Sequence, residues 1–130
     1  MRTDKQKLTC IIVDDETPSH KNLTFHIAKL DWLQIVGNYY NAFDAMDAIK
    51  DLKPDLVFLD VTMPMMTGPE MLEFLPSDDF VVIIITANPR HETDLKDSRI
   101  KAFLNKPVFE SNFSQAIQLS GISDSAGNSD

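Results

Sequence analysis

The stretch Leu56-Val57-Phe58-Leu59-Asp60 is a continuous apolar run that ends in a carboxylate. A short run without polar alternation is typical of a strand buried on both faces of a parallel sheet. A carboxylate at the end of such a strand is costly to bury unless another group uses it. Asp60 is therefore the first candidate for a functional residue.

Working outward from this run, the chain alternates between strand-like and helix-like segments. The strand-like segments are rich in apolar and β-branched residues, and the helix-like ones repeat apolar residues at helical spacing. The predicted strands are 8–13, 33–38, 56–60, 80–86 and 100–104. The predicted helices are 18–30, around 45–52, 68–75, 90–98 and around 113–120. Thr17 is the expected N-cap of the first helix, because Pro18 follows at its first position.

Five strand–helix units in succession predict an α/β fold whose parallel sheet is covered by helices on both faces. Right-handed crossovers leave few topologies for such a chain. We expect an open, doubly wound, five-stranded sheet of the flavodoxin-like (βα)5 type, with strand order 2-1-3-4-5. In this topology the functional site lies at the carboxyl ends of the strands, near the point where the strand order reverses.

Polar side chains occupy that edge of the predicted sheet. Asp14 and Asp15 follow the first strand, Asp60 ends the third, Thr86 ends the fourth and Lys106 lies just beyond the fifth. Three carboxylates in one pocket repel each other and raise each other's pKa. A hard divalent cation relieves this repulsion, and oxygen ligands completed by water suit Mg²⁺.

The chemistry that uses all of these groups is phosphoryl transfer to an aspartate. A carboxylate such as Asp60 can act as the nucleophile and form an aspartyl-phosphate. The transferred group spreads negative charge over its oxygens, so catalysis consists of positioning and charge neutralisation. Mg²⁺ would neutralise one oxygen, Lys106 a second, and the Thr86 hydroxyl would donate to a third.

Length and composition define the broad class of the protein. With 130 residues, 43% of them hydrophobic and 25% charged, the chain reads as one globular domain. Twenty acidic residues against 12 basic ones argue against direct nucleic-acid binding. The single cysteine, Cys10, lies in an apolar run and is compatible with a reducing, cytoplasmic compartment. The polar start is no signal peptide, and no apolar run is long enough to span a membrane.

Four short motifs along the chain carry a resemblance to a known family. They are Val-Asp-Asp-Glu at 13–16, Leu-Asp-Val-Thr-Met-Pro-Met-Met-Thr-Gly at 59–68, Ile-Thr-Ala at 85–87 and Asn-Lys-Pro at 105–107. Their order and spacing resemble the receiver domain of two-component response regulators. The short stretch between Thr86 and Phe103 resembles receivers that precede LytTR-type DNA-binding domains. The expected organisation is a polar tail at 1–7, a receiver domain at 8–120 and a flexible tail or linker start at 121–130.

The resemblance implies roles for the acidic residues. Asp60 matches the phosphoacceptor of the family. Asp15 and Asp60 match its direct Mg²⁺ ligands, together with the backbone carbonyl of Thr62. Asp14 matches an acid that acts on the metal mainly through water.

The resemblance also implies a switch. Thr86 matches the family's switch hydroxyl, Lys106 its phosphate-binding lysine and Phe103 its switch aromatic, although Phe103 also reads as an ordinary core residue. The Lys106–Pro107 bond matches a peptide bond that the family often holds cis. We expect segment 90–98, with Leu95 as its only large apolar residue, to be the most mobile part and to become ordered on phosphorylation.

The implied partners are a histidine kinase or phosphotransfer protein as phosphodonor and an output domain or effector protein as recipient of the signal. A homodimer is compatible with the family. Neither a nucleic acid nor a membrane is an expected partner of this segment. Such a domain assists its own phosphorylation and dephosphorylation and is not otherwise an enzyme.

Two alternatives stay open at this point. A pseudo-receiver would be a binding module that is never phosphorylated, and the intact acidic, threonine and lysine positions argue against it. A haloacid-dehalogenase-like phosphatase also uses an aspartate after an apolar strand. It would need an acid at the position of Thr62 and a cap domain, and the chain offers neither. His20, His26 and His91 are expected to have no part in the chemistry.

Overall fold

The structure is a computed structural model, and it describes residues 7–88 and 95–122. Its centre is a five-stranded parallel sheet with strand order β2-β1-β3-β4-β5. The strands are β1 (Leu8–Val13), β2 (Leu33–Tyr39), β3 (Leu56–Asp60), β4 (Val81–Thr86) and β5 (Ile100–Asn105). The helices in the described ranges are α1 (Thr17–Ile27), α2 (Ala42–Leu52), α3 (Gly68–Glu73) and α4 (Glu110–Ser120). The predicted open, doubly wound, flavodoxin-like topology is confirmed.

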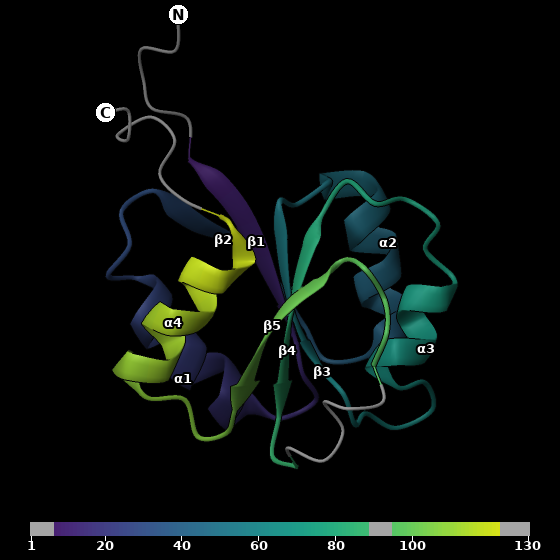
Figure 1. Cartoon of the computed structure of the whole chain (residues 1–130). Helices are drawn as coiled ribbons and strands as arrows, with labels where there is room; N and C mark the ends of the chain where they lie inside the picture. Colours follow the sequence, from purple (N-terminus) through teal and green to yellow (C-terminus); the bar gives the residue numbers. More distant parts are fainter. Residues whose placement is uncertain (1–6, 89–94, 123–130) are drawn as a thin grey trace, which may run out of the picture.

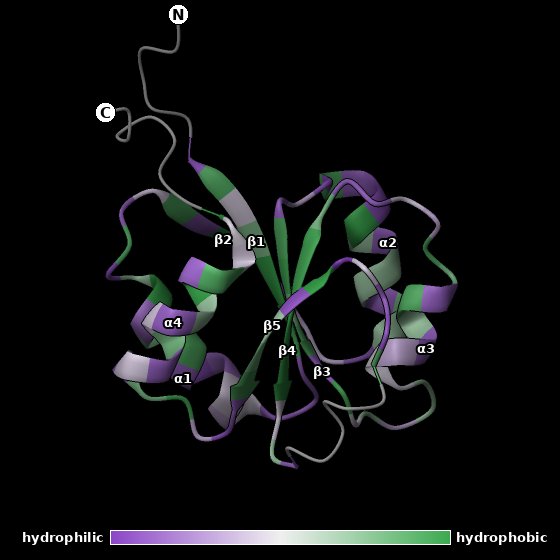
Figure 2. Cartoon of the chain, viewed as in Figure 1, coloured by the Kyte–Doolittle hydropathy of each residue, from purple (hydrophilic) through white to green (hydrophobic). Residues whose placement is uncertain are grey.

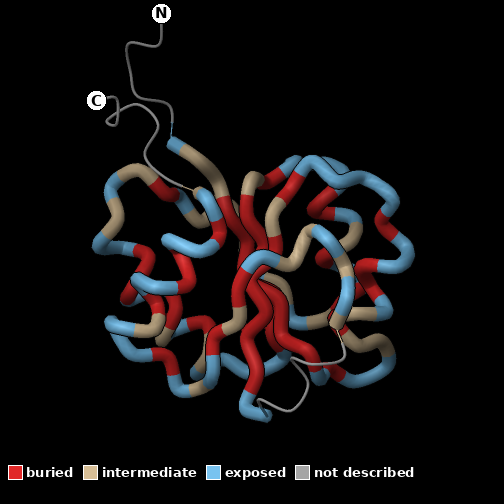
Figure 3. The backbone as a smooth tube through the Cα atoms, viewed as in Figure 1, coloured by how far each residue is buried: buried red, intermediate tan, exposed pale blue. Residues whose placement is uncertain are grey.

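Helices cover both faces of the sheet. Helices α1 and α4 lie on one side, and α2 and α3 lie on the other (Figure 1). The central strands are the most hydrophobic part of the chain (Figure 2), and their backbone runs through the buried interior (Figure 3). None of the described helices is long and apolar enough to cross a membrane.

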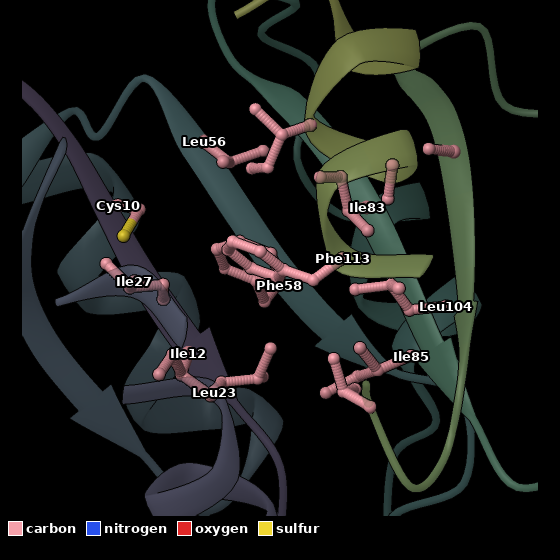
Figure 4. Close-up of a cluster of buried hydrophobic side chains, with 14 of the residues drawn as sticks. Cys10, Ile12, Leu23, Ile27, Leu56, Phe58, Ile83, Ile85, Leu104 and Phe113 are labelled. Atoms are coloured by element: carbon pink, nitrogen blue, oxygen red, sulfur yellow. The ribbon is translucent and has the colours of Figure 1, made fainter. Parts of the chain in front are cut away.

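Alternate residues of the central strands supply two separate cores, because successive side chains of a strand point to opposite faces. On β3, Phe58 belongs to the cluster under α1 and α4, whereas Leu59 belongs to the cluster under α2 and α3. In the first cluster the ring of Phe58 stacks near that of Phe113 from α4, with centroids 6.2 Å apart (Figure 4). Burial on both sides explains why β3 has no polar residue before Asp60.

The strand register aligns the polar strand ends. Leu59 pairs with Val13, so Asp14 and Asp60 follow at the same level of neighbouring strands. Thr86 on β4 pairs with Asn105 on β5, so Lys106 follows β5 one level beyond the position of Thr86. The parallel register therefore brings the ends of β1, β3, β4 and β5 to one edge.

Helix α1 differs from its predicted boundaries. Its N-cap is Glu16 rather than Thr17, and the Glu16 side chain makes no capping hydrogen bond. The helix ends at Ile27 rather than at Leu30, because Lys29 N–H donates to the His26 carbonyl and the chain tightens into a turn. The prediction was wrong at both ends, since apolar periodicity locates a helix better than its ends.

The segment between β4 and β5 also departs from the prediction. Most of the helix predicted at 90–98 lies outside the described residues, and Leu95 to Ser98, which are described, are not helical. Arg99 follows directly after this segment and bonds to the chain around the end of α3. Its guanidinium donates to the carbonyls of Leu72, Leu75 and Ser77 at 2.8, 2.5 and 2.7 Å.

Arg99 therefore ties the start of β5 to the end of α3. It also forms an ion pair of 2.7 Å with Asp97 and lies over the ring of Phe80, 5.2 Å from its centroid. Two of the three acceptors, the carbonyls of Leu75 and Ser77, lie beyond the last residue of α3 and therefore take no part in its helical hydrogen bonds. A nearly buried guanidinium is suited to this because its donors form a rigid planar fork.

We expect Arg99→Ala to lower the free energy of unfolding by about 2 kcal/mol, because several charge-assisted hydrogen bonds are lost together. The free energy of unfolding of Arg99→Lys should lie between those of the wild-type protein and Arg99→Ala, since an ammonium cannot reach all the acceptors. Urea denaturation measures the effect. Lys96→Ala, which removes an exposed charge, is the matched control. Equal stability of the Arg99→Ala and Lys96→Ala variants would show that the arginine does not stabilise this connection.

Candidate functional site

Three carboxylates meet at the carboxyl ends of β1 and β3. Asp14 is fully buried, Asp60 is 4% exposed and Asp15 is exposed. One oxygen of each lies within 4.8 Å of the others. Such a set of hard oxygen donors fits a divalent cation such as Mg²⁺.

The site is an open cavity of about 250 Å³. Acidic, hydroxyl, ammonium and small side chains line it together. They are Asp15, Glu16, Asp60, Thr62, Thr86, Ala87, Asn88 and Lys106. The cavity thus brings together most of the predicted site residues, and the fully buried Asp14 lies behind them.

Lys106 provides the positive charge of the site. Its Nζ lies 2.8 Å from Asp14 Oδ2, 3.5 Å from Asp60 Oδ1 and 3.6 Å from Glu16 Oε1. Burial by itself would lower the pKa of Lys106. The hydrogen bond to Asp14 and the charges of Asp14, Asp60 and Glu16 outweigh it, so the pKa is raised and the ammonium stays charged.

The carboxyl group of Asp60 has a raised pKa. Burial, followed by the charge of Asp14, raises its pKa from 3.8 to about 7. Lys106 and a hydrogen bond from the Thr62 backbone lower it in part, and Asp15 adds a smaller repulsion. A carboxylate under this repulsion gains from any cation that binds beside it.

The Thr86 hydroxyl is engaged with its own loop. It donates to the Asn88 carbonyl at 3.2 Å and accepts from the Asn88 N–H at 2.9 Å. Thr86 is buried, so this pairing satisfies a hydroxyl that would otherwise be costly. The hydroxyl can turn toward a ligand in the cavity only by giving up the bond that it donates to Asn88.

Gly68 lets the loop after Asp60 close against the strand. A Cβ at Gly68 would lie 2.4 Å from the Asp60 carbonyl oxygen, so a side chain there would clash with backbone. The Gly68 N–H donates to the Val61 carbonyl at 3.0 Å. Thr67 and Glu70 then form a capping box that starts α3. This geometry gives the Met-Pro-Met-Met-Thr-Gly motif a structural role in fixing Asp60.

The remaining predicted site residues lie near the cavity. Thr62 is exposed at its rim, and the role of its carbonyl as a metal ligand stays a prediction. Phe103 on β5 is half-buried and packs against the cluster under α2 and α3, as Leu95 also does, and its role as a switch also stays a prediction. The Lys106–Pro107 peptide bond is cis.

Sequence reasoning missed the buried histidines of α1. His20 Nε2 lies 2.8 Å from the Asp14 carbonyl oxygen, and its Nδ1 lies 2.9 Å from Asn38 Oδ1. Its ring stacks on Tyr40, with centroids 4.2 Å apart. His20 therefore supports the backbone of an acidic site residue. In the sequence, the only indication of this role is that His20 follows soon after Asp14 and Asp15, and a histidine at such a distance is too common to be a specific sign. His91 lies outside the described residues.

Comparisons with known proteins agree with this geometry. A model of the family described as the response regulator receiver domain matches residues 10–118. An uncharacterized response regulatory protein of Vibrio vulnificus is 32% identical over 102 residues, which are 78% of this chain and 42% of that protein. The transcriptional regulatory protein BtsR of Salmonella typhimurium is 34% identical over 101 residues, 77% of this chain and 42% of that protein. The chain thus spans less than half the length of these relatives.

Solved structures show the same fold. The response regulatory domain of protein mrkE from Klebsiella pneumoniae has a TM-score of 0.78 at 23% identity, covering 88% of this chain and 95% of that one. The response regulator domain of Thermotoga maritima CheB has a TM-score of 0.76 at 18% identity, covering 91% of this chain and 99% of that one.

We expect Asp60→Asn to stabilise the Mg²⁺-free protein at pH 8. The pKa of Asp60 is raised from 3.8 to about 7, so its ionisation costs stability. This cost is absent below about pH 4, grows as the pH rises to 7 and is complete above it. Three pKa units correspond to at most about 4 kcal/mol. The gain on substitution should therefore be largest at pH 8 and vanish toward pH 4.

Urea denaturation at several pH values tests this expectation. Asp31→Asn, which removes an exposed carboxylate, should show no such pH dependence and serves as the control. A gain for Asp60→Asn that does not change with pH would contradict the raised pKa.

Proposed function

The chain belongs to the response regulator receiver domain family, and we propose that it is a phosphoacceptor signalling domain with Asp60 as the phosphorylated residue. The phosphodonor would be a histidine kinase, a phosphotransfer protein or a small molecule such as acetyl phosphate. The observation that carries the proposal is the position of Asp60, which faces an open cavity between the Lys106 ammonium and two further carboxylates.

The residues of the cavity suit transfer of a phosphoryl group to a carboxylate. An Asp60 oxygen attacks phosphorus, an O–P bond forms, and the bond from phosphorus to the donor atom breaks with its electron pair on the leaving group. Lys106 and the hydroxyl of Thr86 supply donors to the phosphoryl oxygens, whose charge spreads in the transition state. Ala87 leaves space for the group beside them.

Asp14, Asp15 and Asp60 would hold Mg²⁺, with the Thr62 backbone carbonyl as a further ligand. Bound there, the ion would supply positive charge against the phosphoryl oxygens. The three carboxylates fit this role because their oxygens already converge and because burial and repulsion hold the pKa of Asp60 high.

The switch would start at Thr86. A phosphoryl group on Asp60 adds a charge of about −1.5 to −2 and new acceptor oxygens. The Thr86 hydroxyl can donate to them when it releases the Asn88 carbonyl, which frees the loop after β4. The surface around Phe103 would then shift between two populations of the domain.

The signal would pass to an output domain or an effector protein in the cytoplasm. The relatives named as transcriptional regulatory protein BtsR support an output in transcription. A LytTR-type DNA-binding domain is our proposal for that output. The domain would assist its own phosphorylation and dephosphorylation without turning over a free substrate, and a homodimer is one form in which it would act.

We expect acetyl phosphate with Mg²⁺ to add one phosphoryl mass to the protein and Asp60→Asn to abolish the addition. Intact mass spectrometry measures both. Chelation of Mg²⁺ should also prevent the addition. An unchanged mass in the wild-type protein would indicate a pseudo-receiver, and labelling of the Asp60→Asn variant would place the phosphoryl group elsewhere.

We expect Lys106→Ala to slow phosphorylation by about 10²-fold, the usual loss when a donor to a developing anion is removed. Mg²⁺ affinity should stay equal or become tighter, because a competing cation leaves Asp14 and Asp60. Mg²⁺ titration and phosphorylation rates separate the two effects, with exposed Lys101→Ala as the control. A collapse of Mg²⁺ affinity would instead show that the lysine organises the acids.

A further inference from the structure

Asn22 on α1 holds the backbone of the loop that follows β5. Its Oδ1 accepts from the Val108 N–H at 2.9 Å, and its Nδ2 donates to the Val108 carbonyl at 3.2 Å. His26 Nε2 lies 3.1 Å from the same carbonyl, which can only accept, so this nitrogen carries the proton. Two side chains one helical turn apart thus satisfy both backbone groups of a residue 86 positions beyond Asn22.

The residue so held lies two positions after Lys106. The Lys106 N–H donates to the Thr86 carbonyl at 2.9 Å, at the last level of the sheet. Beyond Lys106, Val108 bonds to α1, and the Phe109 N–H at the start of α4 donates to Asn112 Oδ1 at 2.7 Å. Asn22, together with His26, therefore anchors the chain between the end of the sheet and the start of α4, and Asn22 alone bonds to both the N–H and the carbonyl of Val108.

A cavity of about 430 Å³ lies between α1 and this loop. Asn22, Leu23, Ile85, Lys106 and Val108 are among the residues that line it. The loop is therefore not packed tightly against α1 on that side. The Val108 side chain is buried, but packing of an apolar group has no direction, whereas the paired hydrogen bonds fix the orientation of the peptide.

Helix α1 also contacts the other end of the Lys106 ion pair. His20 holds the carbonyl of Asp14, and the Glu16 N–H donates to Asp14 Oδ1 at 2.9 Å. One helix thus supports the backbone of Asp14 and the loop of Lys106, whose charged groups meet at 2.8 Å. A flexible lysine side chain needs such a fixed base to keep its ammonium in one place.

We propose that Asn22 is a positioning residue for Lys106, which sets the reach of its ammonium to Asp14 and to the phosphoryl group. The second part rests on the proposed function, whereas the ion pair with Asp14 does not. A misplaced group at a reacting centre costs far more rate than stability, because transfer needs alignment of the reacting atoms.

The test is a double-mutant cycle on the full chain with acetyl phosphate and Mg²⁺. Asn22→Ala should slow phosphorylation at least about tenfold and leave Mg²⁺ affinity unchanged. In the Lys106→Ala background, Asn22→Ala should cause no further slowing, because it acts through the lysine. Where Lys106→Ala itself slows phosphorylation, additive slowing, or no slowing by Asn22→Ala alone, would overturn the proposal.

Asn41→Ala is the matched control for a purely structural loss. Asn41 caps α2 by accepting from the Asp44 N–H at 2.8 Å, and it lies outside the Lys106 loop. It should lower the urea midpoint without slowing phosphorylation. Slowing by Asn41→Ala of the same size as by Asn22→Ala would overturn the proposal, since general destabilisation would then suffice. Sucrose, which favours the compact state, keeps a weakened variant folded during the assay.

A second cycle uses neither Mg²⁺ nor phosphodonor. Asn22→Ala should lower the urea midpoint more in the wild-type background than in the Lys106→Ala background, because the ion pair with Asp14 is weakened only where the lysine is present. Equal shifts would overturn the positioning role. If Lys106→Ala does not slow phosphorylation, the proposed function of the lysine fails, and this second cycle alone decides whether Asn22 positions it.

Discussion

The ion pair between Lys106 and Asp14 is the interaction on which the site depends. Two carboxylates, Asp14 and Asp60, are almost completely removed from water at the end of the sheet, and burial of charge is costly unless an opposite charge compensates it. The single ammonium of Lys106 touches Asp14 closely and Asp60 at longer range. One positive charge against these acids leaves an excess of negative charge. That excess favours a cation in the cavity, and burial together with the charge of Asp14 keeps the pKa of Asp60 high.

The parallel sheet brings the charged groups of the site together. Carboxyl ends of neighbouring parallel strands lie at one edge, so groups that follow β1, β3, β4 and β5 meet regardless of their distance in sequence. Gly68 keeps the loop after Asp60 tight against the strand, and α1 holds the backbone beside Asp14 and beyond Lys106. The polar groups outside the cavity thus maintain the geometry of those within it.

A second set of contacts lies on the face of the sheet that α2 and α3 cover. Arg99 ties the start of β5 to the carbonyls at the end of α3, and Leu95 packs against the same cluster as Phe103. The strand that carries Phe103 is therefore tied at its start to the end of α3. Thr86, whose hydroxyl bonds to Asn88, and Phe103 lie on the neighbouring strands β4 and β5 of this part of the sheet.

The sequence by itself determined the parallel α/β sheet, its buried strands and the meeting of Asp14, Asp15, Asp60, Thr86 and Lys106 at one edge, because apolar runs that end in polar groups are a pattern that can be read within each segment. It located the limits of α1 less well and predicted a helix through Leu95 to Ser98 that the structure does not contain. The end of α1 depends on turn hydrogen bonds such as that from Lys29 to His26, which apolar spacing does not reveal. Only the tertiary structure revealed that His20 bonds to the backbone of Asp14 and that Asn22 and His26 bond to the backbone of Val108, since hydrogen bonds between distant segments leave no periodic pattern in the sequence.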